Sequence, residues 1–492
     1  MWSGGRLIRE AETLILDAIN RLEPVDVVVL SDRYPPDVMG GAEISLHLAL
    51  RELVGRHRFL VAAFTASPEF CGLTQVDGVT VIRLPISAPW PLNRWPVTVS
   101  TQLASVGLFH PIVARVSGFR AGLADEGVGA FGERLAALRL WMAGSSTGNL
   151  TEHLAQPIAW HLPLIRELIL RCRPRLIHAD NLYSILVAGE VARGGDLRLI
   201  GQVRDNRFLC ARPDQDPRIA GVPCHDCALE CMPMRNAAER RRVGLMSRTR
   251  DYRREKLRRL DRILVASDFL RRQVASVVPG KPLTRIRNSS ENTATVAEWI
   301  ADVSLHPGTP VAVVGTLKAE KGQMGLLQHL PAMVRQIPDL CLHLAGRGPQ
   351  EDTMKTFVVS AGMSRHVIFH GQLARRELYR LLRACRMVVV PSLWPEPCGR
   401  VPVEAALVER PVAAFESGGL AEVIEDGVTG LLARTGDYEQ LASCVVKLAQ
   451  GYAMSAMLAT NAYQIAVANN NPREISKEIL GIWCEEILSN RQ

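Results

Sequence analysis

Two glutamates, Glu396 and Glu404, occupy positions that suit ligand chemistry. The apolar run MVVVPS ending at Ser392 predicts a buried strand, and Glu396 falls in the loop after it. Pro402 suits the first turn of the next helix, so Glu404 lies near a helix N-terminus, where the helix dipole favours a carboxylate. Such a carboxylate can accept hydrogen bonds from two neighbouring hydroxyls, as a ribose diol offers. Taken alone, the pair also fits purely structural roles, with Glu404 as an acidic residue in the first turn of a helix and Glu396 as a solvated loop residue.

The segments around these glutamates offer backbone amides and a cation to an anionic ligand. Amides at the start of the Glu404 helix can meet phosphate or sugar oxygens. They belong to Cys398, Gly399 and Arg400. After the strand VAAF, Gly418 and Gly419 open a further predicted helix, and GTLKAEKGQ places Lys321 where it can neutralise a pyrophosphate. Three such turns at one sheet edge predict a ligand crevice at the carboxyl ends of parallel strands.

Strands alternating with helices must position these turns. Apolar runs such as PVDVVVL, LRLIGQVRD and PVAVVGTL predict buried parallel strands, and two alternating blocks meet near residue 300. We therefore expect an α/β chain with two Rossmann-like, doubly wound domains facing a cleft. The expected divisions are an N-terminal helical extension at 1–23, a first Rossmann-like domain at 24–300 with an insert at 90–160 and a Cys-rich loop at 208–233, a second Rossmann-like domain at 301–452, and helices at 453–492 that pack back on the first domain.

Composition limits the class of protein. A chain of 492 residues with 47% hydrophobic and 22% charged residues is too long for one core and is typical of a globular enzyme. No apolar run reaches the roughly 18 residues that span a bilayer. Acidic residues inside the first apolar stretch argue against a cleaved signal peptide, so we expect a cytoplasmic protein.

The net charge of +8 favours an anionic partner, unless it reflects dispersed surface residues. Nucleotide diphosphates, acidic lipid headgroups and nucleic acid are the candidate classes. The basic stretch 235–259 fits either a solvated helix face or peripheral contact with anionic lipid at the inner face of the membrane.

The order of short motifs resembles a known family. G-x-L-x-x-x-K-G, A-G-R-G-P, V-I-F-H-G, P-S-x-x-x-E, E-x7-E and S-G-G-L-A-E follow one another between Gly315 and about Gly430. This order and spacing is similar to glycosyltransferase family 4 (glycosyl transferases group 1), retaining enzymes of GT-B fold. A looser match in YPPDVMGGAE, LIHAD, ILVASDFLRR and Asn288 extends the resemblance over most of the chain.

The resemblance makes 24–300 the acceptor-side domain and 301–452 the nucleotide-sugar-binding domain, and it implies a role for individual residues. Glu404 would bind the ribose of the nucleotide, and Glu396 would bind donor-sugar hydroxyls near the reacting carbon. Lys321 would contact the diphosphate and balance the charge that grows as the nucleotide leaves. Gly371 would help to place the base, and Gly41 would face the diphosphate from the other domain.

Two positions depart from the family pattern. Thr316 stands in the donor site where many members have Arg, so a pyrophosphate contact is either lost or supplied by Lys318 or Arg400. Many members also have His at the strand end where this chain has Arg204-Asp205. Arg204 either pairs with Asp205 or reaches the donor as part of the catalytic machinery.

The resemblance implies transfer of a hexosyl group, with retention, from a nucleotide-diphosphate sugar to a glycan, lipid-linked or small-molecule acceptor. Cell-surface polysaccharide biosynthesis is the expected setting. No residue is an obvious nucleophile, which favours same-face attack without a catalytic cofactor. A GT-B-fold epimerase or phosphorylase is the alternative. A zinc-stabilised nucleic-acid-binding protein would leave the cluster from Glu396 to Gly419 unexplained, so nucleic acid is not an expected partner.

A second cluster consists of cysteines in the loop 208–233. The pattern C-x13-C-x2-C-x3-C suits a structural zinc, with His225 or His178 as possible replacements. Its members are Cys210, Cys224, Cys227 and Cys231. Unmetallated thiols, a disulfide or an iron–sulfur cluster remain alternatives. The D-x-D at 214–216 is more consistent with solvated loop acids than with a metal site.

If the four cysteines hold zinc, the purified protein should contain about one zinc per chain, because four thiolates complete one tetrahedral shell. Elemental analysis of protein purified without added metal tests this, and a zinc content near zero would contradict it.

Overall fold

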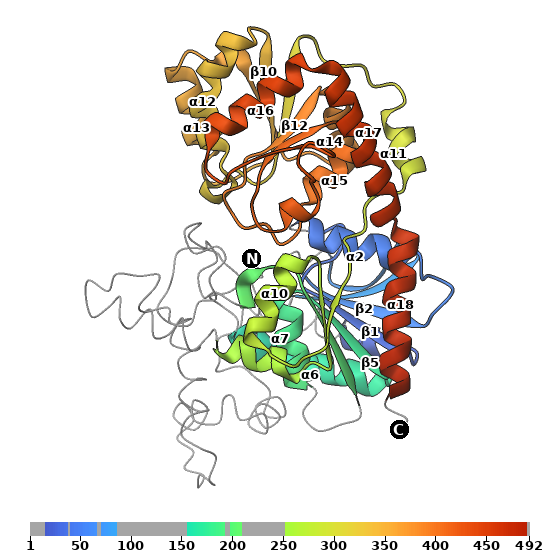
Figure 1. Cartoon of the computed structure of the whole chain (residues 1–492). Helices are drawn as coiled ribbons and strands as arrows, with labels where there is room; N and C mark the ends of the chain where they lie inside the picture. Colours follow the sequence, from blue (N-terminus) through green and yellow to red (C-terminus); the bar gives the residue numbers. More distant parts are fainter. Residues whose placement is uncertain are drawn as a thin grey trace, which may run out of the picture.

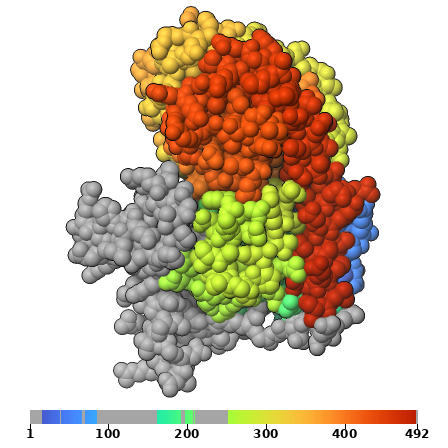
Figure 2. Space-filling view, in the orientation of Figure 1, coloured from blue at the N-terminus to red at the C-terminus, as the bar shows by residue number. Residues whose placement is uncertain are grey.

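Two α/β domains are stacked on one another and joined by a linker and by the C-terminal helices (Figure 1). The structure is a computed structural model that describes residues 15–37, 40–65, 70–85, 155–191, 197–208 and 251–489. All structural statements below refer to those ranges. In the space-filling view the C-terminal residues run along one side of both domains (Figure 2).

The first domain is built on a sheet with the strand order β3-β4-β2-β1-β5-β6-β7-β8, parallel except for the β3–β4 pair. Its central strands are apolar because helices cover both faces, and VVVLS in β1 is buried throughout. The strands are β1 (Val27–Ser31), β2 (Phe59–Thr65), β3 (Gly72–Val76), β4 (Val79–Pro85), β5 (Leu176–Asp180), β6 (Arg198–Val203), β7 (Arg262–Val265) and β8 (Leu283–Arg285). The helices are α2 (Gly41–Arg51), α6 (Ala155–Cys172), α7 (Leu182–Val191) and α10 (Asp268–Val277).

The second domain is built on a parallel sheet with the order β11-β10-β9-β12-β13-β14. The strands are β9 (Thr309–Val314), β10 (Leu340–Ala345), β11 (Val367–Gly371), β12 (Met387–Val390), β13 (Val412–Phe415) and β14 (Leu431–Ala433). The helices are α12 (Gln323–Gln336), α13 (Glu351–Ser360), α14 (Arg375–Ala384), α15 (Arg400–Leu407) and α16 (Tyr438–Gln450). The order reverses direction between β9 and β12, so the loops after these two strands flank a crevice, where ligands bind in such sheets.

The C-terminal helices connect the two domains. Helix α17 (Tyr452–Asn469) packs on α15 of the second domain, and α18 (Pro472–Ser489) lies against the first domain (Figure 1). Trp483 of α18 is buried, and its indole Nε1 donates a hydrogen bond of 3.1 Å to Nδ1 of His178 at β5. Glu486 pairs with Arg198 and Arg262. The predicted return of the C-terminal helix onto the first domain is therefore confirmed, together with the two-domain α/β fold.

His178 has a structural place. It is fully buried beside Trp483, and burial, followed by the charge of Arg204, lowers its pKa to about 3. A neutral, buried imidazole bonded to an indole supports packing, and His178 is absent from the lining of the interdomain pocket.

Some local expectations differ from the structure. The segment around residues 290–308, where the pattern lapses, contains a helix, α11 (Thr293–Ile300), capped by Asn292. The helix expected after Gly418 and Gly419 is a single 3-10 turn, η8 (Gly419–Glu422). Most of the insert 90–160, the Cys-rich loop and the basic stretch before residue 251 lie outside the described residues.

Within the described ranges, no single helix is long and apolar enough to cross a membrane. One bent pair, Tyr438–Gln450 with Tyr452–Ser489, broken at 102°, passes on length and composition alone.

Trp483→Ala should lower the free energy of unfolding by about 3–5 kcal/mol, because it removes a buried aromatic side chain and leaves a cavity. It also leaves His178 Nδ1 without its donor. Urea denaturation followed by circular dichroism measures the change. Leu488→Ala on the same helix is the matched control, since Leu488 is 56% exposed. Equal effects of the two substitutions would contradict the docking role of Trp483.

Candidate functional site

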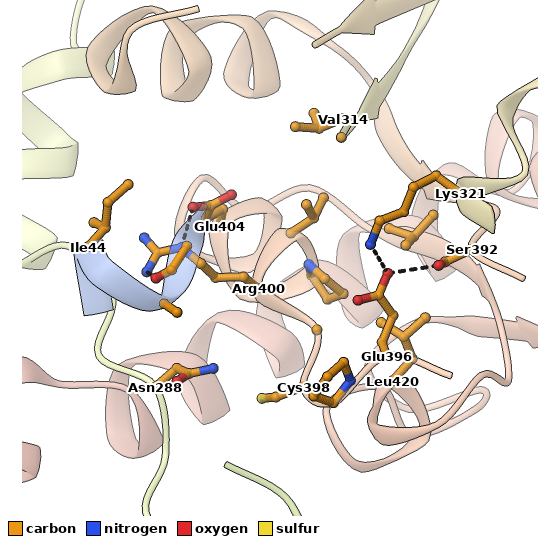
Figure 3. Close-up of a pocket in the computed structure, with 18 of the residues that line it drawn as sticks. Ile44, Asn288, Val314, Lys321, Ser392, Glu396, Cys398, Arg400, Glu404 and Leu420 are labelled. Carbon is orange, nitrogen blue, oxygen red and sulfur yellow. Dashed lines mark hydrogen bonds and ion pairs between the residues drawn. The ribbon is translucent and has the colours of Figure 1, made fainter. Parts of the chain in front are cut away.

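A pocket of about 370 Å³ lies between the domains, at the carboxyl ends of β9 and β12 (Figure 3). The first domain and the linker contribute residues from the start of α2, the end of β6 and the segment after β8. These include Gly41, Arg204 and Asn288. The second domain contributes the loops predicted from the sequence, with Lys321, Glu396, Cys398, Gly399, Arg400 and Glu404 among the lining residues.

Lys321 and Glu396 face each other across the crevice. Lys321 Nζ lies 2.5 Å from Glu396 Oε1, and Ser392 Oγ donates to the same oxygen at 2.7 Å (Figure 3). Gly322 permits this approach: its φ is 71°, and a Cβ there would lie 1.9 Å from the carbonyl oxygen of Pro391. The turn after β9 therefore packs directly on the end of β12.

Gly418 and Gly419 support the loop that carries Glu396. Gly418 forms a β-bridge with Glu396, and the amide of Gly419 donates to the carbonyl oxygen of Glu396 at 2.5 Å. A Cβ on Gly418 would lie 2.5 Å from that same oxygen. Both glycines are absent from the pocket lining, and the Gly419 amide already has a protein acceptor. Their close packing explains why the sequence has two glycines here.

Glu404 and Arg400 pair on the first turns of α15. Glu404 is buried, and Arg400 Nε donates to its Oε1 at 2.9 Å (Figure 3). Arg400 Nη1 reaches the other domain and donates to the carbonyl oxygen of Gly41 at 3.0 Å. A Cβ on Gly41 would lie 2.2 Å from Arg400 Cδ, so a larger residue there would displace the arginine side chain. Arg400 Nη2 is buried and has no hydrogen-bond partner among the described residues.

Arg204 lies at the carboxyl end of β6 and is held by two acceptors. Its Nε donates to Asp180 Oδ1 at 2.6 Å, and its Nη1 donates to Asn288 Oδ1 at 2.7 Å. Burial raises the pKa of Asp180 to about 7, although Arg204 acts in the opposite direction. The ion pair of Arg204 is thus with Asp180 of the neighbouring strand, and Arg204 also lines the pocket.

Thr316 and Gly371, which were predicted to bind the sugar donor, are absent from the pocket lining. The carbonyl oxygen of Thr316 accepts a hydrogen bond from Gln323 Nε2 at 3.2 Å. Gly371 ends β11 with a φ of 67°, and its carbonyl oxygen accepts from the Gly346 amide at 2.7 Å. Cys398, which lies between the two glutamates in the sequence, lines the pocket. Burial raises its pKa to about 11, so the thiol stays protonated near neutral pH.

The cysteine cluster cannot be placed. Cys210, Cys224, Cys227 and Cys231 lie outside the described residues, as does the D-x-D at 214–216. Elsewhere in the described part of the chain, no group of three or more His, Cys, Asp or Glu side chains is arranged to hold a metal ion.

The structure adds lining residues that sequence reasoning had not singled out. Arg375 begins α14 and contacts Glu404, and Gln323 begins α12 with its Oε1 buried and unpaired among the described residues. In the sequence RRELYRLLR, Arg375 is one of several arginines on a polar helix face. Only its place, directly after the loop that follows β11, distinguishes it.

Comparison with known families gives a match that covers the second domain. Residues 304–465 match the family model of glycosyl transferases group 1. The resemblance predicted from the motifs is confirmed. D-inositol 3-phosphate glycosyltransferase of Nocardia farcinica is 33% identical to this chain over 172 residues, 33% of this chain and 37% of that protein. The match therefore spans little more than a third of that relative's length and falls short of a whole-chain relationship.

Solved structures extend the likeness to the whole fold. Sucrose-phosphate synthase from Thermosynechococcus elongatus superposes with a TM-score of 0.64 at 17% identity, covering 94% of this chain and 100% of the other. HepE from Anabaena, solved with UDP-glucose, gives a TM-score of 0.59 at 18% identity and covers 93% and 99%. At such identities the likeness concerns the fold alone, and it confirms the predicted GT-B arrangement.

Proposed function

We propose that the protein is a retaining glycosyltransferase that takes its sugar from a nucleotide-diphosphate donor. The observation that carries the proposal is the convergence of Glu396, Glu404, Lys321 and Arg400 in one pocket between the domains. These residues come from the segments that follow β9 and β12, on either side of the point where the strand order of the second sheet reverses. Two carboxylates beside two cations suit a ligand that combines hydroxyl groups with phosphates.

The donor lies along the pocket from its base to its sugar. Glu404 accepts hydrogen bonds from the ribose hydroxyls, and Gly371 lies on the side of the base. Lys321 neutralises the diphosphate, which Gly41 faces from the first domain. Glu396, already oriented by Ser392, binds hydroxyls of the transferred sugar. Cys398 and Gly399 complete the wall between the two glutamates.

Arg400 supplies the phosphate contact that Thr316 does not. Of the two candidates, Lys318 is 46% exposed, pairs with Glu320 and is absent from the pocket lining. Arg400 lines the pocket and has one terminal nitrogen that is buried and unpaired among the described residues. A buried guanidinium N–H without an acceptor is unfavourable, and a phosphate oxygen would satisfy it.

Transfer proceeds by attack on the same face from which the nucleotide departs. The bond between the anomeric carbon and the diphosphate oxygen breaks, the acceptor hydroxyl bonds to that carbon, and its proton passes to the departing phosphate. Lys321 and Arg400 stabilise the charge that develops on this phosphate. Arg204, held by Asp180 and Asn288, approaches the same centre from the acceptor-side domain. Closure of the two domains excludes water, which would otherwise hydrolyse the donor.

One solved neighbour supports a hexosyl donor of this class. HepE was solved with UDP-glucose, and the Nocardia relative is named for transfer involving D-inositol 3-phosphate. For this chain we propose a glycan, lipid-linked or small-molecule acceptor, in cell-surface polysaccharide synthesis at the cytoplasmic side of the membrane. We include two further features in that proposal: a structural zinc in the loop 208–233, and contact of the basic stretch 235–259 with anionic lipid. A donor that is epimerised without any acceptor would instead indicate a GT-B epimerase.

Glu404→Ala should weaken donor binding by about tenfold or more, because it removes an acceptor of charge-assisted hydrogen bonds. Glu396→Ala should chiefly lower kcat, by about 10²–10³-fold, because its contacts lie next to the reacting carbon. Calorimetric titration with UDP-, GDP-, ADP- and dTDP-sugars gives the affinities, and product formation gives the rates. Wild-type affinity in Glu404→Ala together with wild-type turnover in Glu396→Ala would refute the assignment.

Arg400→Met should weaken binding of the nucleoside diphosphate by about tenfold, since it deletes a charge-assisted contact to phosphate. Lys318→Met, which removes a cation of the same charge outside the pocket, is the matched control and should bind like the wild type. The reverse result, with Lys318→Met impaired and Arg400→Met unaffected, would assign the phosphate contact to Lys318.

A further inference from the structure

Arg375 lies between two buried carboxylates. Its Nε donates to Glu291 Oε1 at 2.6 Å, and its Nη1 donates to Glu404 Oε1 at 3.2 Å. Its Nη2 donates to Tyr379 Oη at 3.3 Å, and the guanidinium lies 5.4 Å from the centre of that ring. Every part of the guanidinium fork is therefore engaged, which fixes the orientation of the side chain at the edge of the pocket.

Glu291 belongs to the segment that links the domains. It follows β8, precedes α11, and is 5% exposed. Arg51 at the end of α2 lies 3.9 Å from its other oxygen. Glu291 thus touches an arginine of each domain, and the shorter contact is to Arg375.

Among the described residues, the donors to Glu404 all bind the same oxygen of its carboxylate. Arg375 Nη1 and Arg400 Nε both donate to Oε1, whereas no described residue donates to Oε2. Two donors on one carboxylate oxygen fix the plane of the carboxylate and leave the second oxygen for a ligand. Although burial lowers the pKa of Arg375, the charges of Glu404 and Glu291 contribute to a net rise, so Arg375 stays charged.

We propose that Arg375 is a positioning residue through which Glu291 of the interdomain linker orients Glu404 for the ribose hydroxyls. The inference rests on the proposed function, since it assumes that Glu404 receives the ribose. Glu291 holds Nε of the fork, so Arg375 meets Glu404 with a single nitrogen. Without Glu291, the fork is free to turn and engage both oxygens of Glu404, which closes Oε2 to the ligand. Without Arg375, Glu404 keeps only Arg400 and loses its fixed plane.

We call the chain of contacts from Glu291 through Arg375 to Glu404 the relay. The relay affects binding of the ribose hydroxyls and does not affect binding of the phosphates. Its loss should therefore weaken a nucleoside diphosphate but not the 2′,3′-dideoxy form of the same nucleotide. This ratio of affinities separates positioning from general stability, because a merely loosened fold would weaken both ligands alike.

The experiment first identifies which of UDP, GDP and ADP binds the protein. Calorimetry then measures the affinity of that nucleotide and the affinity of its 2′,3′-dideoxy form. The wild type should prefer the ribose form about tenfold, the value of a charge-assisted hydrogen bond. Glu404→Gln marks the complete loss of that preference. Arg375→Met and Glu291→Met should each bring the ratio close to that of Glu404→Gln. Arg375→Lys, which keeps the charge but not the fork, should also lose most of the preference and guards against misfolding of the apolar variant.

Arg380→Met is the matched control. Arg380 is on the same helix and pairs with Asp302, away from the pocket lining. It should keep the wild-type ratio. If the Arg375 and Glu291 variants keep the ratio while Glu404→Gln loses it, the relay is wrong and the proposed function stands. If the wild type itself shows no preference for the ribose form, the ribose role of Glu404 fails, and the relay fails with it.

Discussion

The site depends on one constraint, the reversal of strand order between β9 and β12. Parallel strands deliver their following loops to the same edge of the sheet, and at the reversal the chain leaves the two neighbouring strands toward opposite sides, which forms a crevice beside the loops. Lys321 follows β9 and Glu396 follows β12, so their contact at 2.5 Å is a direct result of this topology. The glycines close to this edge serve the same constraint, because backbone must pass against backbone at distances that a Cβ forbids.

The second domain supplies most of the pocket lining, and the first domain closes it. Arg400 reaches from α15 to the carbonyl oxygens of Gly41 and Ser289, while Arg204 reaches Asn288 on the linker. Helix α18, at the end of the chain, packs on the first domain through Trp483, which binds His178. The geometry of the cleft is therefore set by contacts from three distant parts of the sequence.

Strand positions, the parallel architecture and most of the charged residues of the pocket could be predicted from the sequence, because apolar runs and Gly-rich turns are local signals. The residues that contact and orient these side chains could not be predicted. Arg375 reads as one more surface arginine until α14 is placed beside Glu404, and Glu291 lies in a stretch without any periodic pattern. Gly418 shows the reverse case: its sequence signal is clear, but whether a glycine admits a ligand or a neighbouring loop is decided by tertiary packing.

Charge balance in the unliganded pocket gives a reason for selectivity. Among the described residues that line it, each of the four cations has a carboxylate partner: Lys321 with Glu396, Arg204 with Asp180, Arg375 with Glu291 and Arg400 with Glu404. A bare phosphate entering such a site gains attraction from the cations but meets repulsion from carboxylates a few ångströms away. A nucleotide sugar avoids this repulsion, because its ribose and sugar hydroxyls donate to the same carboxylates while its phosphates meet the cations. On the proposed function, the paired charges therefore discriminate against simple anions and favour a ligand that carries both kinds of group at the right separation.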